Sequence, residues 1–388
     1  MIYIFGILLL GYAFSLGMLL YGFRSLSETA LEDKKVPTTE TASEEVTRFS
    51  IIIPFRNEAQ HLPKLVASLL QLSYPSEAFE VLFVDDASED ASEAILGNTL
   101  KAHPEFRHTI LKNKRTSASP KKDAISEALH HAKNQWIVTT DADCEVLPTW
   151  LTALHNCIVL QNPVLIAAPI LYTSTTKVVQ QFQQLDGLSL QMVTMGGFGL
   201  QHPLLCNGAN LAYQKDAFET VNGFSGNDHI ASGDDIFLLD KIRDHFPKQV
   251  TYLKSKDAVV STHPQPTWKK VLAQRVRWAS KTSQQENWIS KLLGMWVLMT
   301  NLGLLLGWVS AFISPSTFYF YFLFVILKWG IDSYMLYTSA HFFELKINAK
   351  ALIASLLVYP LLTVTILLQS VSGSYEWKGR AFKAKGTH

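Results

Sequence analysis

The chain has 388 residues, of which 48% are hydrophobic and 17% are charged, and its formal net charge is +1. This charge excludes the strongly basic surface of a nucleic-acid-binding protein, so no nucleic-acid partner is expected. The three cysteines form no CxxC pair, which excludes a disulfide framework and a cysteine zinc site and fits a reducing cytosolic setting. A chain of this length holds two or three domains, or one large domain with membrane segments.

The first element is an apolar segment at residues 2–23, which contains no charged residue. A helix of this length reaches ~33 Å, enough to cross the ~30 Å hydrocarbon core of a bilayer. A cleaved signal peptide is the alternative, but the segment lacks a basic n-region and no A-x-A cleavage site follows. The sequence therefore predicts a transmembrane anchor over residues 1–26, with Arg24, Lys34 and Lys35 on the cytoplasmic side.

A polar stretch at residues 27–48 has no aromatic residue and is typical of a flexible linker. From residue 49 to 285, β-rich apolar runs alternate with segments of helical spacing. This alternation predicts βαβ units and an α/β fold with a mainly parallel sheet flanked by helices. The predicted strands are 49–54, 80–86, 108–113 and 135–141, and the predicted helices are 57–72, 88–102, 121–132 and 147–160.

Acidic pairs follow two of these strands directly. Asp85 and Asp86 end the second strand, and Asp141 and Asp143 follow the fourth. Ligands bind at the carboxyl ends of parallel strands, so both pairs are expected on one rim of the sheet. Taken alone, the DxD at 141–143 is more often a turn in which aspartate caps the next helix. The functional alternative is a Mg²⁺ or Mn²⁺ ion held by these carboxylates and by substrate phosphates.

Three further groups of residues carry chemistry. Lys121 and Lys122 stand at a helix start, where cations and free backbone N–H groups attract phosphate, unless both form a solvated helix end. Residues 207–210, NGAN, form a turn whose glycine lets the backbone approach a ligand closely. Asp234 and Asp235 begin an amphipathic helix, where a carboxylate serves either as an N-cap or as a general base.

Residues 274–278, QRVRW, combine two arginines with an indole. Arginine suits phosphate through its planar fork of donors, and tryptophan offers a flat apolar face for stacking. The structural alternative is a basic amphipathic helix that lies on the membrane surface. Residues 170–205 carry no motif, and within them 178–193 predicts either a core helix or a helix that lies against lipid.

The C-terminal region, 286–373, is predicted to be membrane-associated and contains three apolar segments at 292–313, 317–339 and 351–371. The middle segment is the weakest, because Lys328 and Asp332 lie on one helix face and charges are costly in a bilayer. Three crossings would place the C-terminus outside, whereas the basic tail at 374–388 favours the inside. Either the middle segment is re-entrant or interfacial, or the charge rule misleads here.

Read together, the motifs PFRNE, VDDASED, KKDA, DAD, GAN, GDD and QRVRW occur in one order between residue 49 and about residue 280. This ordered set resembles the family 2 glycosyltransferases, whose GT-A fold is a Rossmann-like mixed sheet flanked by helices. The single N-terminal anchor and the C-terminal cluster of apolar segments resemble the membrane-bound branch of that family. This branch includes ceramide glucosyltransferases, carotenoid glycosyltransferases and polysaccharide synthases.

The resemblance implies a role for each matching residue. Asp141 and Asp143 would hold Mg²⁺ or Mn²⁺ on the donor diphosphate, and Asp235, with Asp234 beside it, would be the catalytic base. The acceptor would contact Gly208, Asn210 and Trp278. The nucleotide sugar would contact Pro54, Arg56, Glu58, Asp85, Asp86, Lys121, Lys122, Asp141, Gln274 and Arg277. FRNE, DDAS and GDD stand where the family often has YNE, DDGS and TED or GED, which leaves the donor base and the sugar unidentified.

The expected function is inverting transfer of a sugar from a UDP- or GDP-sugar to a hydroxyl of a lipid, lipid-linked or glycan acceptor. The catalytic domain is expected on the cytoplasmic face of a bacterial inner membrane. A processive polysaccharide synthase is the main alternative, although the apolar segments are few for a polymer channel. A nucleotidyltransferase, a non-catalytic membrane module with a nucleotide-sugar pocket and a transporter are weaker alternatives. The nucleotidyltransferase fits less well with QRVRW, and the non-catalytic module fits less well with the intact acids. The transporter fits less well with the large soluble block.

Overall fold

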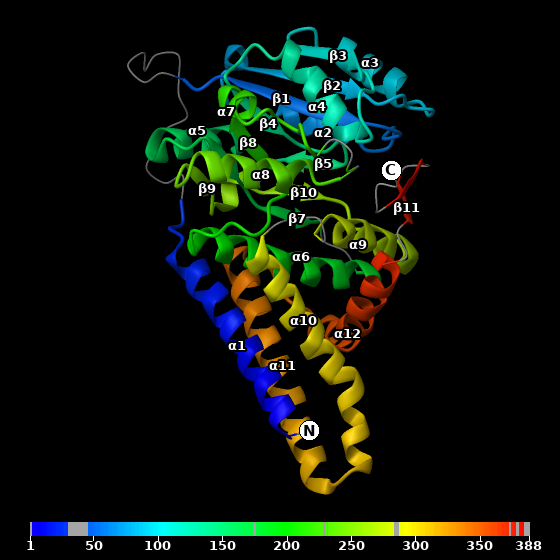
Figure 1. The fold of residues 1–388 in the computed structure, drawn as a ribbon. Helices are drawn as coiled ribbons and strands as arrows, with labels where there is room; N and C mark the ends of the chain where they lie inside the picture. The colour runs from blue at the N-terminus through cyan, green and yellow to red at the C-terminus, as the bar shows by residue number, and fades with distance from the viewer. Residues whose placement is uncertain are drawn as a thin grey trace.

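The computed structural model describes residues 2–29, 46–173, 176–227, 230, 232–282, 287–371, 374–377 and 380–383. Most of the predicted linker, with Lys34 and Lys35, and part of the predicted basic tail, with Lys378 and Lys385, lie outside these described residues. The described chain forms an α/β domain that sits on a bundle of long helices (Figure 1).

The largest sheet of the described residues has seven strands in the order β3-β2-β1-β4-β8-β6-β9. Within it β8 runs antiparallel to both neighbours, and the other pairings are parallel. This arrangement confirms the predicted mixed, mainly parallel sheet. The strands are β1 (Phe49–Phe55), β2 (Phe79–Asp85), β3 (His108–Lys112), β4 (Trp136–Thr139), β6 (Leu165–Ala167), β8 (Leu211–Gln214) and β9 (Val250–Tyr252).

The predicted helices occur in the predicted order, but three of them, α2, α3 and α5, begin three to five residues later than expected. Residues 57–59 and 88–92 hydrogen-bond to each other instead of entering their helices. The Asn57 N–H donates to Ser88 Oγ at 3.1 Å, and the Glu58 N–H donates to Ser92 Oγ at 2.7 Å. The helices are α2 (Leu62–Leu70), α3 (Ser92–Lys101), α4 (Pro120–His131), α5 (Trp150–Gln161), α7 (Lys215–Thr220) and α8 (Asp234–His245).

A second sheet, which the sequence did not predict, has the order β5-β10-β7. Its strands have three residues each: β5 (Cys144–Val146), β7 (Ile170–Tyr172) and β10 (Val260–Thr262). Such short strands carry no readable alternation of apolar and polar residues, so their pairing comes from tertiary contacts. Because β5 begins directly after Asp143, this sheet fixes one end of the DxD turn.

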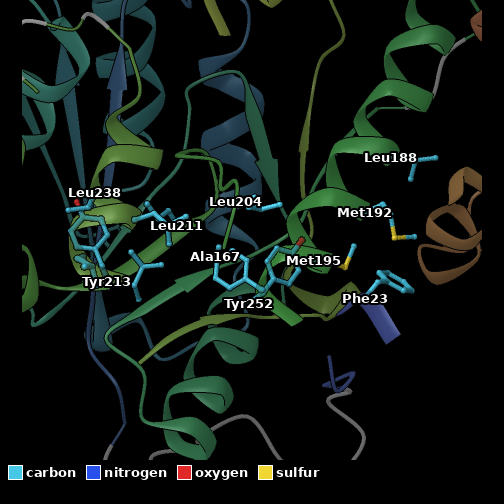
Figure 2. Close-up of a cluster of buried hydrophobic side chains, with 14 of the residues drawn as sticks. Phe23, Ala167, Leu188, Met192, Met195, Leu204, Leu211, Tyr213, Leu238 and Tyr252 are labelled. Atoms are coloured by element: carbon cyan, nitrogen blue, oxygen red, sulfur yellow. The ribbon is translucent and has the colours of Figure 1, made fainter. Parts of the chain in front are cut away.

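One hydrophobic core joins the large sheet to the bundle of long helices through α6 (Val178–Gly199). Met192 and Met195 of α6 lie in one cluster with Tyr252 of β9 and with Phe23, which belongs to α1 (Ile2–Ser25) (Figure 2). Close backbone contact with α1 requires glycine, since a Cβ added at Gly196 would lie 2.5 Å from the Leu19 carbonyl oxygen. The segment 178–193 is therefore a core helix, and it lies between the sheet and the bundle.

Three described helices are long and apolar enough to cross a membrane: residues 2–25 (α1), 288–310 and 349–370. The last two correspond to α10 (Trp288–Gly307), which continues into a short 3-10 helix, and to α12 (Ala349–Val371). The predicted segment 317–339 lies in α11 (Pro315–Phe342) and is not one of the three. By composition alone α11 remains the weakest candidate, as the sequence analysis expects.

Packing singles out α11 rather than α12 as the partner of α1. The Tyr12 hydroxyl of α1 donates to Asp332 Oδ1 of α11 at 2.7 Å, and Phe23 meets Phe342 with ring centroids 6.1 Å apart. Two contacts about ten residues apart on each helix show that α1 and α11 run side by side in the same direction. In Figure 1, α1, α10 and α11 extend together away from the sheets.

The helix α12 stays close to the catalytic domain. It packs on α6 and on α9 (Trp268–Thr282), and Pro360 interrupts its hydrogen bonding near the middle. After it, β11 (Ser374–Trp377) and β12 (Arg380–Lys383) form a hairpin within the segment that the sequence analysis describes only as a basic tail. Arg380 contacts Asp86, so this hairpin lies on the same side as the catalytic domain.

Candidate functional site

The carboxyl ends of β1, β2 and β4 meet on one rim of the large sheet, as the strand order requires. Asp85 is the last residue of β2 and is buried. Its Oδ1 accepts a hydrogen bond from the Ser88 N–H at 3.0 Å, and its Oδ2 pairs with Lys112 Nζ at 2.9 Å. This carboxylate therefore shapes the turn after β2 and joins β2 to the end of β3.

Asp86 lies next to it and has a different set of partners. Asn113 Nδ2 donates to its Oδ1 at 2.7 Å, and Arg380 Nη1 pairs with its Oδ2 at 2.5 Å. Arg380 reaches this carboxylate from β12, near the C-terminal end of the described chain. The sequence analysis did not anticipate that the C-terminal hairpin contributes to this rim.

The residues of PFRNE gather beside the same acidic pair, as predicted. Pro54 lies in β1 opposite Val84 of β2. Arg56 is buried, and its Nη1 donates to the Asp86 carbonyl oxygen at 2.9 Å and also contacts the Ala87 carbonyl oxygen. Glu58 is buried too, and its N–H bonds to the start of α3. These residues hold the loop after β2 in shape.

The centre of the site is the ammonium of Lys121, in the first turn of α4. Its Nζ lies 2.7 Å from Asp141 Oδ1 at the end of β4 and 3.2 Å from Asp234 Oδ2 at the start of α8. Burial alone would lower the pKa of Lys121, but the charges of Asp141 and Asp234 outweigh it and raise the pKa above its usual value. Lys121 therefore carries a fixed positive charge, which joins two motifs that lie far apart in the sequence.

Lys122 faces away from this centre. It is 1% exposed, and its Nζ donates to the Ile230 carbonyl oxygen at 3.0 Å and to the Asn227 carbonyl oxygen at 2.5 Å. Its ammonium also lies 5.2 Å from the centroid of the Phe237 ring. Lys122 thus anchors the loop before α8, and a solvated helix end is wrong for both lysines.

The GDD sequence does not cap α8 with a side chain. The N-cap is Gly233, whose φ of 85° suits glycine, and Asp234 and Asp235 are the first helical residues. Asp235 Oδ2 accepts a hydrogen bond from the Gly208 N–H at 3.3 Å. A Cβ added at Gly208 would lie 2.7 Å from Asp234 Oδ2, so the turn at 207–210 approaches both acids closely. The capping alternative is therefore wrong here.

Asn210 is buried, and its side-chain amide has three partners. Its Nδ2 donates to the carbonyl oxygens of Pro169 and Ala258, each at 2.8 Å, and its Oδ1 accepts from Trp150 Nε1 at 3.0 Å. These bonds connect β8 to α5 and to the second sheet. In the described structure Asn210 supports the turn that carries Gly208.

Asp141 of the DxD turn lies at the charged centre, and Asp143 directly precedes β5. Asp141 is 38% exposed, and its Oδ2 has no hydrogen-bond partner among the described residues. Neither DxD residue caps α5, whose N-cap is Thr149. Within the described chain no group of three or more His, Cys, Asp or Glu side chains is placed to hold a metal ion. Two carboxylates at an open rim still fit Mg²⁺ or Mn²⁺, which proteins often bind with one or two carboxylates plus substrate phosphates.

The QRVRW sequence lies in α9, between the second sheet and α12. Gln274, Arg277 and Trp278 are half-buried, whereas the arginine between them, Arg275, is buried. Arg275 Nη2 pairs with Asp186 Oδ2 of α6 at 2.5 Å, and its guanidinium carbon lies 4.1 Å from the centroid of the Trp278 ring. The structure thus places Gln274 and Trp278 against an arginine that the prediction passed over.

Asp186, Lys112 and Arg380 are the other site residues that sequence reasoning missed. One signal was available for Asp186, because it is the only charged residue in the 22 residues of α6. A single acid in a long apolar helix is costly unless it is paired. Lys112 and Arg380 had no such local signal, since their partners lie 27 and 294 residues away.

Comparison with sequence families gives two matches. A family model described as "Glycosyl transferase family 2" matches residues 50–221. A second, described as "Glycosyl transferase family group 2", matches residues 136–367, which is more than half of the chain.

Individual relatives match shorter parts. Beta-monoglucosyldiacylglycerol synthase of Trichormus variabilis is 29% identical over 97 residues, which are 25% of this chain and 20% of that protein. Undecaprenyl-phosphate 4-deoxy-4-formamido-L-arabinose transferase of Sodalis glossinidius is 33% identical over 112 residues, or 28% of this chain and 32% of that protein. The matched part is thus a fifth to a third of the length of these relatives.

Among solved structures, the mannosyltransferase PcManGT of Pyrobaculum calidifontis, in complex with GDP-Man and Mn²⁺, has a similar fold. The TM-score is 0.56 at 16% identity, and the alignment covers 95% of this chain and 99% of that one. At this identity the likeness concerns the fold alone.

The geometry around Lys121 can be tested through stability. Lys121→Met keeps the stem but removes the charge, so Asp141 and Asp234 lose their shared partner. We expect the free energy of unfolding of the detergent-solubilised protein to fall by about 1–2 kcal/mol, less than for a fully buried ion pair because Lys121 and Asp141 are 17% and 38% exposed. Thermal unfolding measures this, and Lys114→Met, which breaks the exposed pair with Glu127, is the control with little expected effect. Equal stability of both variants would contradict the assignment.

Proposed function

The chain belongs to the family 2 glycosyltransferases and has their GT-A fold, and we propose that it transfers a single sugar from a UDP- or GDP-sugar to a hydroxyl of a lipid or lipid-linked acceptor. One observation carries the proposal: Lys121 joins the acid of the DxD turn to the acids at the head of α8 in one partly open cluster. Two relatives are named for reactions on a diacylglycerol lipid and on undecaprenyl phosphate, which supports a lipid acceptor.

The donor side of the proposed site is the rim formed by β1, β2 and β4. The nucleoside lies beside Asp85, Asp86 and the loop that Arg56 holds. The diphosphate lies near Lys121, whose fixed charge stabilises the negative charge that develops on the leaving group. Gln274 and Arg277 of α9 face the same diphosphate. In this placement Asp86 contacts the nucleotide. Asn113 and Arg380, which bind the Asp86 carboxylate in this structure, would then shift when the nucleotide binds.

A divalent cation fits beside Asp141 and Asp143, because both offer carboxylate oxygens at the open rim. When bound, Mg²⁺ or Mn²⁺ supplies additional positive charge to the diphosphate. The residues of this chain hold the cation, bind the donor and position the acceptor. The mannosyltransferase of similar fold was solved with Mn²⁺, which is compatible with this choice.

Asp235 is the proposed general base. Its Oδ2 accepts a long hydrogen bond from the Gly208 N–H, at 3.3 Å, and its Oδ1 accepts one from the Ile236 N–H at 2.8 Å. In the reaction the acceptor oxygen forms a bond to the anomeric carbon, and the bond from that carbon to the diphosphate oxygen breaks. The acceptor proton passes to Asp235, and the diphosphate keeps the bonding electron pair. Attack opposite to the leaving group inverts the anomeric configuration.

The acceptor side is proposed to face the membrane. Trp278 lies in α9, which packs on α12, and Gly208 forms the wall beside Asp234 and Asp235. Asn210 contributes by holding the turn that carries Gly208. An acceptor that stays in the bilayer therefore reaches the site without leaving its lipid surface.

We place α1, α10 and α11 across the membrane and α12 as a helix that enters and returns. The two charges of α11 are paired with each other and with Tyr12 of α1, which lowers the cost of burying them. With three crossings the catalytic domain and the C-terminal hairpin share the cytoplasmic side of a bacterial inner membrane. Three crossings also leave little material for a polymer channel, which favours single addition over processive synthesis, and the length of the product decides between them.

The base assignment gives a prediction. Asp235→Asn keeps one oxygen, which can accept from either the Gly208 or the Ile236 N–H group, but it cannot take a proton. We expect the transfer rate to fall about 10²- to 10⁴-fold with donor affinity unchanged. Mass spectrometry of lipid extracts with a panel of UDP- and GDP-sugars measures transfer, and calorimetry measures donor binding. Asp244→Asn, at the other end of α8, is the control. Parallel loss of binding and turnover would remove Asp235 from the base role.

A second prediction concerns the cation. Excess chelator should stop transfer, and added Mg²⁺ or Mn²⁺ should restore it, because Asp141 and Asp143 hold the ion against the diphosphate. The variant Asp141→Asn should need a higher cation concentration for half-maximal activity. Full activity in chelator would eliminate the metal role of both residues.

The membrane arrangement gives a third. With Cys206 replaced by serine, single cysteines are introduced at Ile313, Lys350 and Ser370 and tested with an impermeant thiol reagent on intact cells. Ile313→Cys, between α10 and α11, should react from outside, whereas Lys350→Cys and Ser370→Cys, near the two ends of α12, should react only after the cells are opened. External labelling of Ser370→Cys would mean that α12 crosses.

A further inference from the structure

The guanidinium of Arg275 joins three elements that meet between the catalytic rim and the membrane helices. Its Nη2 lies 2.5 Å from Asp186 Oδ2 of α6, and the two side chains are only 7% and 9% exposed. Within α9 the guanidinium carbon lies 4.1 Å from the centroid of the Trp278 ring, and Nη1 donates to Gln274 Oε1 at 3.2 Å. One side chain therefore contacts two of the three residues that the proposed function uses in QRVRW.

Tyr172 of β7 is the third element near Arg275. Burial raises the pKa of Tyr172, and the nearby charge of Arg275 opposes this rise whereas the charges of Asp186 and Asp143 add to it. The chain makes room for this ring with a glycine, since a Cβ added at Gly187 would lie 3.0 Å from Tyr172 Cδ2. The contact around Arg275 thus extends through the second sheet to the DxD turn.

The other side of α6 is fixed to the membrane bundle. Ser339 Oγ of α11 donates to the Leu188 carbonyl oxygen at 3.0 Å, two residues from Asp186. Further along α6, Gly196 lies against the backbone of α1. The position of the Asp186 carboxylate is therefore set by helices of the membrane bundle and not by the catalytic domain alone.

Stability alone does not account for a buried ion pair at this place. Taking two charges out of water is costly, and a well-packed apolar pair of the same volume is often as stable or more stable. An apolar pair cannot, however, hold a planar fork of donors against an indole face, a tyrosine hydroxyl and an amide at the same time. The Asp186–Arg275 pair therefore fits a role in holding the side chains around Arg275 in a fixed arrangement.

We infer that Asp186 and Arg275 are positioning residues for the acceptor: they fix the indole of Trp278, and with it the acceptor hydroxyl, relative to Asp235. This inference rests on the proposed function. In this inference α6, which has no recognisable motif, connects the helix bundle to the acceptor site, so that the bundle determines where Trp278 lies. A small displacement of a reacting group costs a factor on the order of 10²-fold in rate, so the pair has a measurable effect on transfer.

The experiment compares four variants of the full chain in lipid nanodiscs: Asp186→Asn, Arg275→Lys, the apolar double variant Asp186→Leu/Arg275→Met, and the control Glu344→Gln, which breaks the exposed pair with Lys256. Rates are measured with the acceptor and the donor varied separately, together with donor affinity and thermal stability. We expect kcat/KM for the acceptor to fall on the order of 10- to 100-fold in the first three variants, with donor affinity unchanged. Arg275→Lys keeps the charge but loses the fork, so it should not rescue.

The double variant separates positioning from folding. It removes the buried charges, so its thermal stability should return to that of the unmodified protein while the loss in acceptor kcat/KM persists. Normal acceptor kinetics in the double variant would overturn the inference, as would an equal loss of donor affinity in Asp186→Asn.

A readout without turnover keeps the inference separate from the proposed function. In protein labelled with 5-fluorotryptophan, the fluorine resonance missing from Trp278→Phe identifies residue 278. This resonance should shift or broaden in Asp186→Asn and in the double variant but not in Glu344→Gln. An unchanged resonance overturns the inference whatever the activity, whereas absence of transfer by the unmodified protein, with every donor and lipid tested, overturns the proposed function and the acceptor role that rests on it.

Discussion

The site depends on one buried charge, the ammonium of Lys121. Without it, Asp141 and Asp234 would repel each other across the rim, and the end of β4 would separate from the head of α8. With it, the turn at Gly208 closes against the same acids, where a larger side chain would collide with Asp234. The DxD turn and the GDD helix are therefore one electrostatic unit. This unit explains why the DxD motif, which by itself is weak evidence for a site, becomes specific when it occurs together with KKDA and GDD.

A second constraint acts at a larger scale, because the catalytic sheet and the membrane bundle share a core. Residues of β9, α6, α1 and α11 belong to one cluster, and glycines bring the backbones of α1 and α6 into contact (Figure 2). The orientation of the sheet relative to the helix bundle is thus set by packing.

Much of the fold was readable in the sequence because its signals are local. Each strand of the parallel half is an apolar run, and its acids follow directly, so Asp85, Asp86 and Asp141 were predicted where they lie. The three-residue strands, the Arg275–Asp186 pair and the Arg380–Asp86 pair were not predicted, since each depends on contacts between distant segments. The alternative of a solvated helix end for the lysines of α4 is wrong for the same reason, because the acids and the loop that cover this helix start come from distant segments.

The membrane segment extends this reasoning to the interior of the bilayer. Composition alone ranks α11 below α12, because it counts Lys328 and Asp332 as two unpaired charges. In the folded bundle they pair at 2.5 Å with exposures of only 1% and 13%, and Tyr12 of α1 completes the group. Lys121 and Asp141 also form a pair, but they are 17% and 38% exposed at an open rim. A closed pair has no capacity for a ligand and serves to join two helices, whereas a partly open pair retains a carboxylate oxygen for an incoming ion or substrate. Exposure, rather than the presence of charge, distinguishes the closed pair in the helix bundle from the partly open pair in the candidate site.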